Sequence, residues 1–155
     1  MSILTRLTAG AQLSDPREGR GTGPSEITVA EIGMAAGTLD AFSYDLVMQL
    51  HCDQPPSNIS RTLTEIQRLF LTQWNIGKGP ESLSRKRLDL VAKALWRDFS
   101  TNQRMTDLER ATLCGMTDRH WRRGTNEVYR ATIAEINTIA TKAYRDIKRQ
   151  LKADI

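Results

Sequence analysis

One segment of the chain sets the predicted fold: Thr106-Asp-Leu-Glu-Arg-Ala-Thr-Leu-Cys-Gly-Met-Thr-Asp-Arg-His-Trp-Arg-Arg123. Thr106 is a typical N-cap residue, and the acidic residues that follow it suit the positive end of a first short helix. Gly115 tolerates the positive φ that a tight turn requires, and Thr117 can cap a second short helix. This order of elements predicts a helix-turn-helix over residues 106–123.

The apolar residues of this stretch indicate which sides of the two short helices face inward. Ala111 is small enough to let the second helix approach the first, while Cys114 and Met116 flank the glycine as apolar wedges. Trp121 is expected to point into the core as the large anchor. Gly124 stands where a second apolar anchor is usual, so we expect the second helix to end there and to be short.

The remaining residues of the second helix are polar and are expected on its outer side. The N-terminal residues of such a helix contact base edges when it enters the major groove, and arginine pairs bidentately with guanine O6 and N7. The alternative is a helical corner with a basic surface and no DNA contact. The candidate DNA-contacting residues are Thr117, Asp118, Arg119, His120, Arg122 and Arg123.

The charge of the chain is unevenly distributed. Residues 1–84 carry six Lys/Arg against nine Asp/Glu, and residues 85–152 carry sixteen against eight, within a net charge of +4. A basic segment attracts the phosphate backbone and gains affinity by releasing counterions, although a basic surface can also serve solubility alone. The candidate phosphate contacts are Arg85, Lys86, Arg87, Arg145, Lys148 and Arg149.

Apolar residues at three- and four-residue spacing predict an all-α fold without strands. Residues 1–24 are rich in Gly and Pro and predict a flexible arm. Residues 25–155 are expected to form a single compact helical domain, with a mildly acidic part over 25–80 and a basic part over 81–155 that contains the helix-turn-helix. The expected helices start at Thr28 (ending before Gln54), at Ser60 (ending near Asn75), at Ser82 or Ser84 (ending near Thr101), and at Asn126 (ending near Lys152, with Thr125 as N-cap).

Several function classes lack their sequence signatures. The short Gly77-Lys-Gly79 segment is no phosphate-binding loop, and no nucleophile elbow is present, so we expect no enzyme activity and no cofactor. The two cysteines and two histidines have poor spacing for zinc, so we expect reduced thiols and no metal site. No signal peptide and no membrane-spanning apolar run are evident, which favours the cytoplasm and no membrane partner.

Two segments resemble a known family. Ser25-Glu-Ile-Thr-Val-Ala-Glu-Ile-Gly-Met-Ala-Ala-Gly37 is similar to the segment after the loose arm in the Q antiterminators of lambdoid bacteriophages, with its Met-Ala-Ala element. Arg119-His-Trp-Arg-Arg123, with Tyr129-Arg130, resembles the Trp/Arg/Tyr-rich C-terminal half of short Q-type proteins. The resemblance covers about a third of the chain, which lacks the Cys-x-x-Cys zinc element of one branch of the family.

The resemblance implies a transcription regulator of the bacterial host cell. Q proteins bind a DNA site that overlaps a late promoter and load onto RNA polymerase paused just downstream, with sigma factor still attached. They then travel with the polymerase and hinder terminator hairpins. On this resemblance Arg119, Arg122 and Arg123 would contact DNA, and Trp121 would anchor their helix.

The sequence thus favours a phage-type DNA-binding transcription regulator, with antitermination as the expected activity and double-stranded DNA and RNA polymerase as partners. One alternative is a DNA-binding repressor or a terminase-type packaging subunit, which should dimerise or form rings. The other is a protein-interaction module that binds no DNA and uses the long C-terminal helix as an arm. The sequence predicts no particular oligomeric state.

Overall fold

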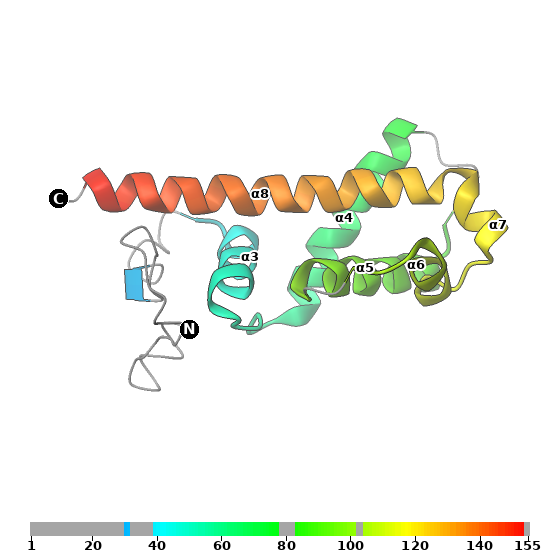
Figure 1. Ribbon diagram of the computed structural model, residues 1–155, viewed down its shortest axis with the longest axis horizontal. Coiled ribbons are helices and arrows are strands. Elements are labelled where there is room, and N and C mark those ends of the chain that lie inside the picture. The colour runs from blue at the N-terminus through cyan, green and yellow to red at the C-terminus, as the bar shows by residue number, and fades with distance from the viewer. Residues whose placement is uncertain (1–29, 32–38, 78–82, 102–103, 154–155) are drawn as a thin grey trace. The chain divides into compact units, whose positions relative to one another are not determined.

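The computed structural model describes residues 30–31, 39–77, 83–101 and 104–153. Within these ranges every regular element is a helix, which confirms the all-α prediction. The arm predicted for residues 1–24 lies outside the described residues. The elements are α3 (Ala41–Cys52), α4 (Ile59–Gly77), α5 (Arg85–Ser100), α6 (Asp107–Leu113), α7 (Asp118–His120), the π-helical turn η3 (Trp121–Thr125) and the long C-terminal helix α8 (Asn126–Ala153) (Figure 1).

The chain forms two compact units. Asn58–Thr138 makes up the first unit, which contains α4 to α7, η3 and the first part of α8. The second unit combines α3 with the part of α8 from Ile139 onward. The sequence predicted other bounds, namely an arm over 1–24 and a single helical domain over 25–155 with parts 25–80 and 81–155. That predicted division stays a prediction.

Two amphipathic helices form the base of the first unit. The buried positions of α4 include Ile66, Phe70 and Trp74, which recur every fourth residue and therefore lie along one side of the helix. Val91, Leu95 and other apolar residues give α5 a similar buried side, and α4 packs directly against α5. Ser84 N-caps α5, as predicted, by accepting a hydrogen bond from the backbone N–H of Arg87.

The second unit differs from prediction at its first helix. The capping pattern at Thr28, which itself lies outside the described residues, predicted one helix ending before Gln54, but Asp40 is extended and N-caps the helix α3. The prediction was wrong because the Asp40 carboxylate accepts the Ser43 N–H at 2.8 Å, which satisfies a helix N-terminus at that point. Apolar residues of α3 and α8 then form a small core of Val47, Met48, Cys52, Ala143 and Ile147.

The start of α8 also differs from prediction. Thr125 was expected to N-cap this helix, but it lies inside η3, which runs directly into α8. The Asn126 N–H bonds to the carbonyl of Trp121, which satisfies one of the backbone donors at the start of α8. Thr125 is buried, and its hydroxyl has no hydrogen-bond partner among the described residues.

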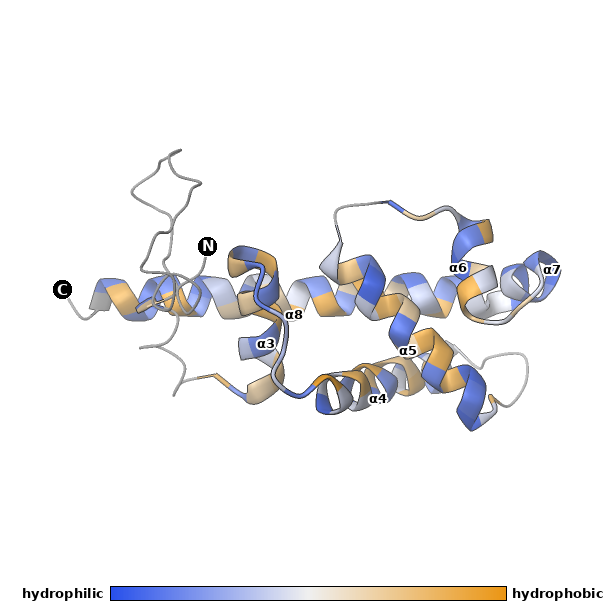
Figure 2. Cartoon of the chain, turned by 90° about the horizontal axis from the view of Figure 1, so that it is seen from below, coloured by the Kyte–Doolittle hydropathy of each residue, from blue (hydrophilic) through white to orange (hydrophobic). Residues whose placement is uncertain are grey.

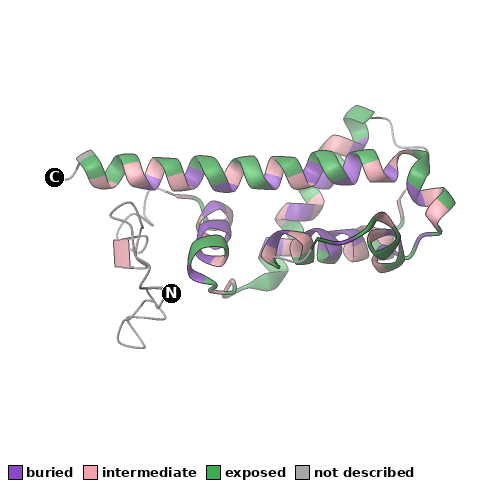
Figure 3. Ribbon diagram, viewed as in Figure 1, coloured by how far each residue is buried: buried purple, intermediate pink, exposed green. Residues whose placement is uncertain are grey.

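The long helix α8 is amphipathic along its length. Hydrophilic and hydrophobic residues alternate along it in the pattern of a helix with one apolar side (Figure 2). Exposed residues follow one edge of this helix and buried ones the other (Figure 3). Its fully buried positions include Tyr129 and Ile136 in the first unit and Ile147 in the second.

Candidate nucleic-acid interface

The first short helix of the predicted helix-turn-helix is capped as its sequence indicates. Thr106 and Glu109 form a reciprocal capping box at the start of α6. The Glu109 backbone N–H donates to Thr106 Oγ1 at 3.1 Å, and the Thr106 backbone N–H donates to Glu109 Oε1 at 2.8 Å. Two otherwise unpaired backbone groups are thereby satisfied, which defines where α6 begins.

The turn after α6 is a Schellman motif centred on Gly115. Gly115 has φ 71°, its N–H bonds to the Thr112 carbonyl at 3.0 Å, and the Met116 N–H bonds to the Ala111 carbonyl at 2.8 Å. The predicted position of the turn and its positive φ are therefore confirmed. Ala111, Cys114 and Met116 are buried, as the sequence predicted for the residues that bring the two helices together.

The second short helix begins at Thr117, whose hydroxyl accepts the His120 N–H at 3.1 Å. Trp121 is fully buried, and its ring meets that of Tyr129 edge-on with centroids 5.1 Å apart. Gly124 has φ 131°, so regular helical backbone ends after Arg123 before the chain enters α8. The expectation of an inward tryptophan and of a short second helix is confirmed.

A buried polar cluster, not predicted from the sequence, joins three helices beneath this element. Asp98 of α5 accepts hydrogen bonds from Arg110 Nε at 2.9 Å and Arg110 Nη2 at 3.3 Å, and from the Tyr129 hydroxyl. The Asp98 side chain is 7% exposed. Burial is the largest single influence and disfavours the charge on Arg110, but the hydrogen bond and the charge attraction to Asp98, with contributions from Tyr129 and Asp107, together outweigh it and raise the pKa of Arg110. We call Asp98, Arg110 and Tyr129 the buried cluster.

Two further contacts tie the helix-turn-helix to its neighbours. Arg130 of α8 donates to both carboxylate oxygens of Asp107 at 3.0 and 2.9 Å, and these hydrogen bonds lower the pKa of Asp107. Arg87 of α5 donates from Nη2 to the Gly115 carbonyl at 3.2 Å, directly at the turn. A side chain of α5 thus holds the turn before α7, and a side chain of α8 holds the start of α6.

The predicted DNA-contacting residues occupy the outer side of α7 and η3. Arg119 and Arg123 are exposed, and their side chains make no ion pair or hydrogen bond within the part of the chain that the structure describes. Arg122 is also exposed, but its Nε lies 3.0 Å from Asp118 Oδ2. Exposed pairs of this spacing contribute only about 0.3–0.5 kcal/mol to stability. His120 is half-buried and Thr117 is exposed.

The predicted phosphate contacts fall into two groups. Arg85 and Lys86 are exposed at the start of α5, in the same unit as α7, whereas one nitrogen of Arg87 is already bonded at the turn. The second group belongs to the other unit, on α8. In that group Arg149 pairs with Asp146, Lys148 lies 5.5 Å from the Tyr144 ring, and Arg145 is exposed.

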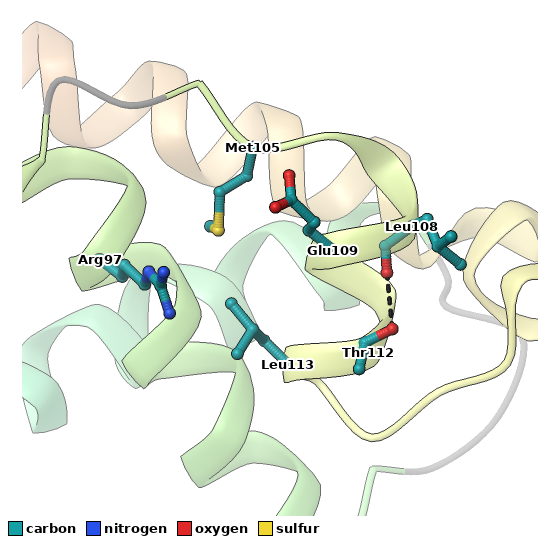
Figure 4. A pocket seen from close by; sticks show the side chains of 6 residues that line it. All are labelled: Arg97, Met105, Leu108, Glu109, Thr112 and Leu113. Carbon is teal, nitrogen blue, oxygen red and sulfur yellow. Dashed lines mark hydrogen bonds between the residues drawn. The ribbon is translucent and has the colours of Figure 1, made fainter.

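A surface hollow of about 290 Å³ lies between α5 and α6 (Figure 4). Its polar lining groups are largely used within the chain: the Thr112 hydroxyl donates to the Leu108 carbonyl at 2.8 Å, and Glu109 belongs to the capping box. Leu108 is 63% exposed, whereas Met105 is buried. The hollow is open, and its titratable lining side chains are Arg97 and Glu109.

Both cysteines are free and buried, as expected for reduced thiols. Burial raises the pKa of the Cys114 thiol to about 12. Among the described residues, no group of three His, Cys, Asp or Glu side chains is placed to hold a metal ion.

Comparison with protein families, with curated proteins and with solved structures finds no match to this chain. In the described part of the chain, no helix combines the length and apolar composition that crossing a membrane requires.

Proposed function

We propose that this protein is a non-enzymatic regulator that binds double-stranded DNA through the outer side of α7 and η3. The supporting observation is a set of three exposed arginines, Arg119, Arg122 and Arg123, on a short helix whose opposite side is anchored by the fully buried Trp121. A rigid helix with cations on its free side has the chemistry that major-groove contact requires.

The rest of the same unit supplies two kinds of support for this proposal. Arg85 and Lys86 add exposed positive charge on α5, which can contact phosphates and set the orientation on the duplex. The buried cluster and the Arg87 contact hold the turn in place, so that few conformations are lost on binding. The helical segment before Gly124 is short, so we expect few directly contacted base pairs and a large contribution from phosphates.

We further propose that the regulator is a phage-type antiterminator. This finer proposal is supported by the resemblance of residues 25–37, of 119–123 and of Tyr129-Arg130 to the lambdoid Q proteins. It implies bacterial RNA polymerase with sigma factor as the protein partner, and the cytoplasm of the bacterial host as the location. A purified transcription system with a phage late promoter and a downstream terminator tests it, because readthrough should rise when the protein is added.

The DNA-binding proposal is tested by fluorescence anisotropy on duplex DNA at low and high salt. The double variant Arg119→Ala/Arg122→Ala should remain folded, because both side chains are exposed, and should bind DNA at least about tenfold more weakly. The matched control is Arg97→Ala/Arg104→Ala, which removes the same charge from exposed positions outside α7.

Equal losses in the two variants, or wild-type binding that salt does not weaken, would refute a specific role for α7. If the wild-type protein binds no duplex at low salt, the protein-interaction alternative is favoured instead. Light scattering separates the remaining alternatives, since a stable ring would support a packaging subunit.

A further inference from the structure

The ion pair between Asp118 and Arg122 distinguishes one of the three exposed arginines from the other two. Asp118 Oδ2 lies 3.0 Å from Arg122 Nε, with the two side chains 43% and 70% exposed. Arg119 and Arg123 make no ion pair within the described residues, although each is close to Asp118 in sequence. The outer side of α7 and η3 therefore carries two unpaired guanidinium groups and one that is already held by a carboxylate.

A carboxylate at this position opposes general binding to DNA. The affinity of a basic surface for any duplex comes from neutralising phosphates, and Asp118 repels phosphates and competes with them for Arg122. The ion pair between Asp118 and Arg122 is exposed, so it also adds little to the stability of the folded protein. At the start of α7 the negative charge of Asp118 interacts favourably with the helix dipole, and this interaction requires no contact with Arg122.

The geometry of the pair leaves a particular edge of Arg122 available. The closest contact to Asp118 is made through Nε, and neither terminal nitrogen, Nη1 or Nη2, forms a hydrogen bond within the described residues. Two parallel N–H groups at this end of a guanidinium match the O6 and N7 acceptors of guanine. A carboxylate beside Nε restricts the rotation of the guanidinium and leaves its planar terminal fork for a second partner.

We propose that Asp118 is a specificity-determining residue, which holds Arg122 for bidentate contact with a guanine and withholds it from phosphates. This inference rests on the proposed DNA binding by α7. Arg119 and Arg123, which lack a carboxylate partner among the described residues, contact phosphates instead. The DNA site therefore contains a guanine opposite Arg122. Asp118 lowers the affinity for duplexes of any sequence and raises the discrimination at that base pair.

The experiment first selects a preferred duplex from a pool with randomised sequence, using the full-length protein. Dissociation constants are then measured for the selected duplex, for a duplex with the guanine replaced, and for an unrelated duplex. In Asp118→Asn, discrimination at the guanine should fall by about 5- to 100-fold. Binding to the unrelated duplex should tighten. The slope of the logarithm of its association constant against the logarithm of salt concentration should become steeper by up to about one unit.

Opposite changes for selected and unrelated DNA separate this role from a structural one. A residue that only supports α7 would weaken binding to all three duplexes in proportion when it is replaced. The matched control is Arg123→Ala, which should weaken binding to all three duplexes to a similar degree and reduce the salt dependence by about one unit. Arg122→Lys keeps the charge but loses the fork of two nitrogens, so it should lose the discrimination and retain binding to the unrelated duplex.

Two results would overturn the inference. Unchanged discrimination in both Asp118→Asn and Arg122→Lys, with wild-type binding intact, refutes the role of the pair and leaves DNA binding standing. Absence of any wild-type binding to duplex refutes the proposed function itself, and the role of the pair with it. A thermal melt of each variant, monitored by circular dichroism, verifies that the comparison is made between folded proteins.

Discussion

Replacing Asp98 by asparagine should destabilise the protein far more than any exposed charge substitution. Asp98 accepts hydrogen bonds from Arg110 and from the Tyr129 hydroxyl while being only 7% exposed. A neutral amide in its place would leave the Arg110 guanidinium, 17% exposed, without its main counter-charge. Removing one partner of a buried ion pair costs about 3–5 kcal/mol of unfolding free energy.

The lower end of that range applies here for structural reasons. Arg110 keeps some contact with water, and Asp107 lies 3.7 Å away as a second carboxylate. We therefore expect a loss of about 3 kcal/mol for Asp98→Asn. At roughly 2–4 °C per kcal/mol for a chain of about 150 residues, the melting temperature should fall by about 6–12 °C.

The assay is urea and thermal denaturation at pH 7, followed by circular dichroism. The control is Asp89→Asn on the same helix, because Asp89 pairs with Lys93 at the similar distance of 3.0 Å but is 45% exposed. This control should lose less than about 0.5 kcal/mol. The double variant Asp98→Leu/Arg110→Met, which removes both charges, should recover much of the loss. Asp98→Asn losing no more than the control would refute the stabilising role of the buried cluster.

Three further predictions concern the turn, acid stability and thiol reactivity. Gly115→Ala places a Cβ 3.2 Å from Leu90 Cδ1 at a residue with φ 71°, so it should lower the unfolding free energy by about 1–2 kcal/mol in urea titrations. Gly115→Asn should lose less, because asparagine tolerates positive φ better than alanine. An unchanged urea midpoint for Gly115→Ala would contradict the turn assignment. Because the folded pKa of Asp107 is lowered by Arg130, the stability from this pair should be complete above the ordinary pKa of 3.8 and lost as the pH falls through the lower folded value. Melting temperatures measured from about pH 6 to about pH 2.5, on both sides of the ordinary carboxyl pKa of about 4, should therefore converge for wild type and Arg130→Met at the acid end, and a constant difference would contradict this. Cys114, with its pKa raised to about 12, should react with Ellman's reagent at pH 8 only as the protein unfolds, and fast labelling of the folded protein would contradict its burial.

Much of the candidate site could be predicted because its determinants are local. The capping box at Thr106, the positive φ at Gly115 and the cap at Thr117 each depend on groups within three or four residues of one another. Helical periodicity likewise predicts that Trp121 points inward and Arg119 outward. These parts agree with the structure because a helix end must satisfy its backbone groups wherever it lies.

The first helix shows where local signals compete. Thr28 and Asp40 are both good N-cap residues, and the apolar pattern continues past the second of them. The sequence offered no way to rank the two caps, and the structure starts α3 at Asp40. Thr125 is a similar case: it is a plausible cap residue, but the backbone leaves helical geometry one residue earlier, at Gly124, and the buried Thr125 hydroxyl forms no hydrogen bond with a described residue.

Local sequence was enough to specify the helical class, the turn at Gly115 and the division of α7 into an anchored and a charged side. The contacts that hold this element in place, in contrast, depend on tertiary packing. Asp98 meets Arg110 and Tyr129 at sequence separations of 12 and 31 residues, and Arg87 reaches Gly115 across 28. No helical period links such positions, because their contact exists only once α5, α6 and α8 pack together, and the same packing makes the charges of Asp98 and Arg110 mutually dependent.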